Sequence, residues 1–282
     1  MEVKILSTFE KAKDYLKAAE QNGFDKQNLW QKYMIDPFWA EISQWAPFDT
    51  SYMKPLNIQN TAELKEQLSL LSAVSIEELY NGFTKITEML PKDDDDPMIV
   101  ALYPLCDSNA IVKERQNGVV GACVFGNIII NINPLAKDYQ DWIPYVFAHE
   151  YHHSVWGYNW FVLKGGQDLE GSFLEYMLNE GQADTFAESL FPQLTPQWNQ
   201  SLDTNTESQL WEKVKRILFS KDQQIHSKYM FGDEGEGLPW CMGYSLGRTI
   251  IGDYLHGHPD ISFPDLINVP AKKILQESRF KL

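Results

Sequence analysis

The sequence predicts an α+β protein that is mostly helical and carries a small β-sheet. Apolar residues recur three and four positions apart through most of the first ninety residues and again after residue 138, as in amphipathic helices. Two apolar runs rich in β-branched residues, 98–105 and 118–133, lie between these helical regions. Strands that follow one another and precede a run of helices are typical of α+β folds.

Residues 1–92 are predicted to form a helical N-terminal region. Asn60 precedes Glu63 by three positions, and Ser75 precedes Glu78 by the same distance, so each pair fits a capping box at the start of a helix. The segment PKDDDDP at 91–97 follows. Its aspartates lack the alternating spacing and distal glutamate of an EF-hand loop, which favours a solvated linker.

Residues 97–282 are then expected to form a second domain. In it, 118–133 is predicted to be a long strand or a hairpin with bulges marked by glycine, and Gly121 and Gly126 would allow a backbone or ligand to approach closely. Helices are expected near 141–157, 168–191, 207–220 and 240–256.

Composition excludes several classes of function. The 282 residues carry a formal net charge of −15, and no cluster of Lys and Arg is present to follow a phosphate backbone, so nucleic-acid binding is not expected. No apolar run approaches ~18 residues, so no membrane span is expected. Cys106, Cys123 and Cys241 are too few for a disulfide framework. The first residues lack the apolar core of a signal peptide, so a cytoplasmic location is expected.

The segment His149-Glu150-Tyr151-His152-His153 fits the H-E-x-x-H pattern of zinc enzymes. Residues four apart share one helix face, so His149 and His153 can bind one ion at about 2.1 Å. Glu150 is rotated by about 100° and can contact a water molecule at the ion instead. His152 points elsewhere and is not expected to be a ligand. Pro144 fits the first turn of this helix.

Catalytic zinc takes three protein ligands and keeps one position open. No further histidine pattern follows His153, but Glu180 stands 27 positions later in FLEYMLNEGQADTFAESLF. A carboxylate there completes a His₂Glu site. Asp184, one turn further, can accept the second ring N–H of His149 and so fix its tautomer. The small residue Gly181 permits a close approach of another helix.

Three segments resemble a family of bacterial proteins, the predicted Zn-dependent proteases typified by YjaZ. They are AHEYHH at 148–153, NEGQADTFA at 179–187 and PWCMGYSLGRTIIGDYL at 239–255, with weaker support from 261–280. The resemblance covers residues 97–280. It implies a zincin-like peptidase fold of the gluzincin type but no particular substrate. The site itself predicts Zn²⁺ as the cofactor and a peptide or protein as the substrate.

Further candidates lie outside the metal ligands. A donor aimed at the developing oxyanion assists hydrolysis, and Tyr244 is the first candidate for it, with Arg248 the second. His226, His256 and His258 are expected at the surface, although His226 is the one that could enter the cleft. The 118–133 segment can border the cleft as an edge strand that pairs with extended substrate, or it can be an ordinary core strand.

The predicted function is zinc-dependent hydrolysis of peptide bonds with Glu150 as the general base. Two alternatives stay open from the residues. The same site could hydrolyse small amides or epoxides, or the protein could be a regulatory or interaction protein with a vestigial zinc site.

Overall fold

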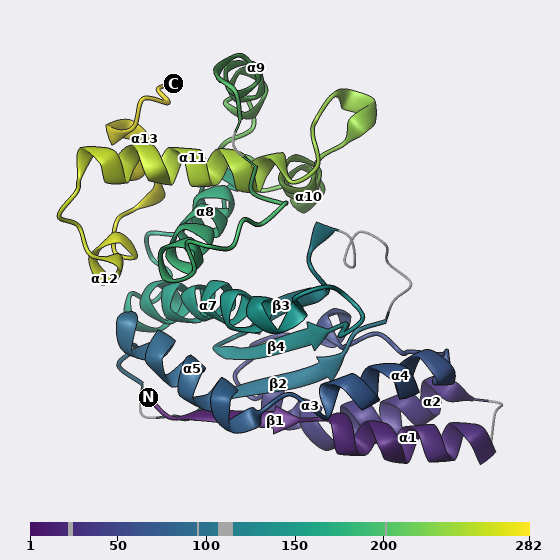
Figure 1. Ribbon diagram of the computed structural model, residues 1–282. Coiled ribbons are helices and arrows are strands. Elements are labelled where there is room, and N and C mark those ends of the chain that lie inside the picture. The colour runs from purple at the N-terminus through teal and green to yellow at the C-terminus, as the bar shows by residue number, and fades with distance from the viewer. Residues whose placement is uncertain (22–24, 95, 107–114, 201) are drawn as a thin grey trace. The chain divides into compact units, whose positions relative to one another are not determined.

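The computed structural model describes residues 1–21, 25–94, 96–106, 115–200 and 202–282 (Figure 1). The chain divides into two compact units, Met1–Ser154 and Val155–Leu282, which are described in turn. The boundary falls within helix α7 (Tyr139–Gly157). The division predicted from the sequence, at 92 and 97, lies elsewhere in the chain and stays a prediction about domains.

The first unit contains a mixed four-stranded sheet in the order β1-β2-β4-β3 (Figure 1). β1 (Val3–Ser7), β2 (Met98–Pro104) and β4 (Asn127–Ile132) are parallel, and β3 (Val119–Val124) is antiparallel to β4. β2 is buried along its whole length and β4 nearly so, as expected of strands covered on both faces. The predicted small sheet in a mostly helical protein is therefore confirmed.

The 118–133 segment forms a hairpin whose two-residue turn is Phe125-Gly126. Both turn residues have positive φ, 49° and 102°, as the type I′ turn of a two-residue hairpin requires. Gly121 pairs directly with Ile130 in an unbroken register, so the expected bulge at that glycine is wrong. Among the strands of the described residues, β3 has a neighbour on one side and lies at an edge of the sheet.

The N-terminal region is mostly helical, as predicted. Its helices are α1 (Phe9–Gln21), α2 (Lys26–Trp30), the π-helix η1 (Gln31–Ile35), α3 (Asp36–Ile42), the 3₁₀-helix η2 (Ser51–Met53), α4 (Thr61–Leu71) and α5 (Ile76–Met89). The side chains of Asn60 and Ser75 accept hydrogen bonds from the first turns of α4 and α5. Strand β1 was not predicted, because of its five residues only Val3 is buried and the apolar pattern is weak.

α7 is fixed in rotation by contacts along its length. Phe147 stacks on Phe83 of α5 with ring centroids 3.9 Å apart. One turn later, the Tyr151 hydroxyl donates a hydrogen bond to the Leu90 carbonyl oxygen at 2.7 Å. Because α7 begins at Tyr139, Pro144 lies inside the helix, and the prediction that it belongs to the first turn is wrong.

The second unit is helical. It contains the π-helix η3 (Tyr158–Leu163), α8 (Phe173–Leu190), α9 (Thr204–Val214), α10 (Gln223–Phe231), the 3₁₀-helix η4 (Glu234–Glu236), α11 (Met242–Gly257), α12 (Phe263–Leu266) and α13 (Ala271–Glu277). α8 begins at a complete capping box, in which Ser172 and Glu175 satisfy each other's backbone N–H groups. No helix within the described ranges has both the length and the apolar character to cross a bilayer.

Glycines bring α8 and α11 into backbone contact. A Cβ atom placed on Gly181 would lie 2.4 Å from the Gly247 carbonyl carbon, and one on Gly247 would lie 2.2 Å from the Met177 carbonyl oxygen. Real side chains do not approach backbone atoms that closely. Gly181 therefore permits the close helix approach that its small size predicted.

Candidate metal centre

One turn of α7 carries both histidines of the H-E-x-x-H segment. His149 is buried, with 8% of its surface exposed, and His153 is half-buried. Their Nε2 atoms lie 3.1 Å apart, so the two rings point at a common place. An ion bound tetrahedrally at about 2.1 Å from each nitrogen requires a separation of roughly 3.4 Å. The observed spacing is close to that requirement.

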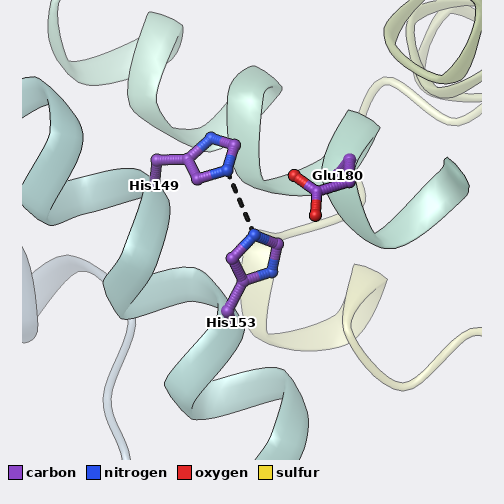
Figure 2. Close-up of side chains that lie close together, drawn as sticks. All are labelled: His149, His153 and Glu180. Atoms are coloured by element: carbon purple, nitrogen blue, oxygen red, sulfur yellow. Dashed lines mark hydrogen bonds between the residues drawn. The ribbon is translucent and has the colours of Figure 1, made fainter. Parts of the chain in front are cut away.

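The carboxylate of Glu180 on α8 lies beside these nitrogens (Figure 2). One ligand atom from each of His149, His153 and Glu180 lies within 4.8 Å of the others, and the three could hold a metal ion. Two imidazoles and a carboxylate are a donor set that Zn²⁺ prefers. The residues present therefore fit a zinc ion. His152 is fully buried, and it does not belong to this group within the part of the chain that the structure describes.

Glu150 lies against the backbone of β3. A Cβ atom at Gly121 would lie 2.3 Å from Glu150 Cγ and 2.7 Å from its Oε1 atom. The absence of a side chain at 121 thus gives the Glu150 side chain its place. Burial raises the pKa of the nearby Cys123 thiol to about 12, and the charge of Glu150 adds to that rise. Cys123 is therefore a protonated, unreactive thiol at neutral pH, unsuited to be a nucleophile.

Asp184 is fully buried one turn after Glu180 on α8. Its Oδ1 atom accepts a hydrogen bond from the indole Nε1 of Trp198 at 3.2 Å. The sequence did not identify Trp198 as a part of this region. A buried carboxylate held in one orientation suits the positioning of a ligand imidazole, and the predicted bond from Asp184 to His149 stays a prediction.

The hydroxyl of Tyr244 interacts electrostatically with the carboxylate of Glu180. Burial raises the pKa of the Tyr244 hydroxyl well above its ordinary value, and the negative charge of Glu180 raises it further. The hydroxyl is therefore neutral across the physiological range and keeps its proton as a hydrogen-bond donor. Its ring also contacts Phe231, with centroids 5.9 Å apart.

Arg248, one turn later on α11, is paired with another acid. Its Nε atom donates to Oε2 of Glu188 on α8 at 2.7 Å, and Asn199 donates to the other oxygen of Glu188 at 2.9 Å. Burial raises the pKa of Glu188, and the Arg248 guanidinium opposes that rise. The sequence assigned no role to Glu188 or Asn199. Glu188 meets Arg248 across 60 residues and Asn199 across 11, and neither contact leaves a local pattern in the sequence.

The three remaining histidines fall in different environments. His256 is exposed, as predicted. His258 is half-buried, and its ring stacks on that of Tyr254. His226 is 3% exposed and its Nε2 atom lies 2.7 Å from the Ser220 carbonyl oxygen, so the surface prediction is wrong for it. The apolar residue Met230, four positions later, is buried on the same helix face, and that spacing was the signal that could have placed His226.

Comparison of the sequence with known proteins identifies the family of this chain. The sequence profile of the predicted Zn-dependent protease family (DUF2268) matches residues 76–276. The chain belongs to this family. The match includes His149, His153 and Glu180, and it begins at the first residue of α5, earlier than the resemblance at 97–280 suggested.

This chain is also similar to the uncharacterized protein YjfC of Bacillus subtilis (strain 168). The two are 28% identical over 171 residues, which cover 56% of this chain and 55% of YjfC. The alignment thus spans about half the length of that relative. No solved structure matches the chain.

Proposed function

We propose that this protein is a zinc-dependent metallopeptidase that hydrolyses peptide bonds, with His149, His153 and Glu180 as the metal ligands. The observation that carries the proposal is the convergence of two imidazole nitrogens and one carboxylate, all within 4.8 Å. Membership of a predicted Zn-dependent protease family supports it and implies a protein substrate.

His149, His153 and Glu180 would hold Zn²⁺, which would supply a Lewis acid for the scissile carbonyl and for a water molecule. Three protein ligands, and not four, would suit a catalytic zinc ion and not a structural one. Asp184, which accepts a hydrogen bond from Trp198, is the residue that we expect to orient the His149 imidazole.

Glu150 is the general base of the proposed reaction. Its carboxylate accepts a proton from the attacking water and then delivers that proton to the leaving amine nitrogen. The position of Glu150 supports this role, because the missing side chain at Gly121 leaves room for a buried carboxylate on the residue next to the ligand His149.

Tyr244 is the donor that we assign to the developing oxyanion. Its hydroxyl is neutral and lies near Glu180, so it can donate to an oxygen bound close to the ligands. Arg248 is the second candidate for this task. Its Nε atom already donates a hydrogen bond to Glu188, so we place Tyr244 first. β3 is the edge strand of the sheet among the described residues and lies against Glu150, and there we expect extended substrate to pair by β-augmentation.

Replacement of Glu150 by Gln tests the proposal. The amide cannot accept the proton, so peptide turnover should fall by roughly 10²–10⁴-fold, the usual contribution of a general base. Zinc content should stay that of the parent, because Glu150 is not a ligand. The measurement is cleavage of a peptide library beside elemental analysis of both proteins.

Undiminished turnover in Glu150→Gln would remove Glu150 as the base. A parent enzyme that cleaves small amides or epoxides and leaves every peptide intact would replace the peptidase by another zinc hydrolase. Turnover that persists in the presence of 1,10-phenanthroline would exclude metal chemistry altogether, and a parent inactive on every substrate would favour a regulatory protein.

A further inference from the structure

A cavity of about 480 Å³ in the second unit lies outside the proposed metal ligands. Arg248, Glu188 and Asn199 line it, together with the uncharged polar residues Thr195, Gln197 and Gln200. Among the described residues that line the cavity, the charged side chains are the ion pair of Arg248 and Glu188. What the cavity can bind therefore depends on which of their atoms are already engaged.

Glu188 has both carboxylate oxygens engaged. Oε2 accepts from Arg248 Nε and Oε1 accepts from Asn199 Nδ2. Asn199 is 5% exposed and is thus itself held in place. Because both Glu188 oxygens already accept hydrogen bonds, Glu188 is poorly suited to bind a ligand and instead positions the Arg248 guanidinium.

Arg248 keeps most of its donors. Across the described ranges its one hydrogen bond is the one from Nε to Glu188, so the terminal Nη1 and Nη2 groups make none. The side chain is 40% exposed and borders the cavity. A guanidinium fixed at Nε presents its two Nη groups as a planar fork, and that fork matches the two oxygens of a carboxylate.

We infer that this cavity binds a carboxylate of the peptide substrate through the Nη groups of Arg248, with Glu188 as the positioning residue. The inference rests on the proposed peptidase function. It names a substrate class, namely peptides with a carboxylate a few residues from the bond that is cleaved. A protein with a formal net charge of −15 repels such a group elsewhere, so a positioned cation is needed to bind it.

The positions along α8 and α11 connect this cavity with the proposed catalytic residues. Arg248 follows Tyr244 by one helical turn, and Glu188 follows Glu180 by eight positions, which is about 12 Å along the α8 axis. An extended peptide advances about 3.3 Å per residue, so roughly four residues span that distance. Either a C-terminal carboxylate or an acidic side chain could supply the bound group at that separation.

Binding of matched peptides tests the inference without any need for turnover. The full chain carrying Glu150→Gln is titrated calorimetrically with N-acetyl-tetraalanine as the free acid, with its C-terminal amide, and with N-acetyl-Ala-Ala-Ala-Glu amide. The free acid should bind roughly tenfold to a hundredfold more tightly than the alanine amide, the usual gain from charge-assisted hydrogen bonds. The third peptide shows whether a side-chain carboxylate is accepted as well.

Two further variants in the same background separate the guanidinium from charge in general. Arg248→Gln should abolish the preference for a carboxylate, and Arg248→Lys should retain a smaller one because Lys lacks the fork. Arg216→Gln removes the same charge from an exposed position on the same unit and should leave the preference unchanged.

Equal affinity for the acid and the alanine amide, no binding of either, or a preference that survives Arg248→Gln would each overturn the inference. These outcomes are distinct from a failure of the proposed function. That function is tested by turnover and zinc content, whereas the titration measures affinity in a protein that is not required to turn over.

Discussion

Glycines at two places in this molecule make room for different groups. At Gly121 in the first unit, the missing side chain makes room for another side chain, that of Glu150. At Gly181 and Gly247 in the second unit, the missing side chains let two helix backbones touch. The first contact places one chemical group, and the second places whole helices.

The same residue type therefore makes room for a proposed catalytic side chain in one place and for helix packing in the other. Loss of space at Gly121 displaces a carboxylate whose flexible side chain can move, so the fold should survive and the chemistry should suffer. Loss of space at Gly247 pushes against the Met177 carbonyl, which belongs to a helix backbone and cannot yield cheaply. Substitutions at the two sites should therefore separate activity from stability.

The larger effect of these glycine substitutions is expected from Gly121→Ala. The new methyl group would lie 2.3 Å from Glu150 Cγ, so the carboxylate must leave its place. We expect peptide turnover to fall by about a hundredfold, as for a catalytic group misplaced by about 1 Å. Zinc content should not change. Steady-state kinetics and metal analysis measure both quantities.

Gly82→Ala is the control for that substitution, because a Cβ atom there meets nothing within 4 Å. It should leave turnover as it is. If Gly121→Ala were as active as this control, the place that we assign to Glu150 would be incorrect.

A smaller effect, on stability instead of catalysis, is expected from Gly247→Ala. Its Cβ atom would lie 2.2 Å from the Met177 carbonyl oxygen, so α8 and α11 must separate. The free energy of unfolding should fall by about 1–3 kcal/mol, the usual cost of an extra methyl group in a well-packed place. Urea unfolding followed by circular dichroism measures it.

Gly252→Ala provides the matched change on the same helix. A Cβ atom at 252 meets nothing within 4 Å, and alanine is favoured over glycine in a helix by about 1 kcal/mol. This variant should be slightly more stable than the parent. Equal stability of the two alanine variants would mean that the backbone contact of α8 with α11 is absent in solution.

Local patterns predicted the parts of the site that lie on single helices. The i, i+4 spacing of His149 and His153 is a property of one short segment, and so is the pairing of Glu180 with Asp184 one turn later. Glu180 could be proposed as their partner because zinc chemistry demands a third ligand. Gly121 was expected to permit a close approach, but no local signal identified Glu150 as the residue that approaches it.

Long-range pairings could not be predicted in this way. β1 pairs with β2 across some 95 residues, and Arg248 meets Glu188 across 60, so neither contact leaves a periodic trace in the sequence. The surface prediction for His226 failed for a related reason. Charged neighbours suggested solvent, whereas the buried face of α10 is set by packing in the core of the second unit.

Zinc stoichiometry of two alanine variants of α8 tests the proposed metal centre most directly. Glu180→Ala removes a proposed ligand, whereas Glu175→Ala removes a carboxylate that accepts hydrogen bonds from the backbone at the start of the same helix. We predict about one zinc ion per chain in the parent and in Glu175→Ala, and a large loss of zinc in Glu180→Ala. Equal zinc content in the two variants would contradict the assignment of Glu180 as a ligand.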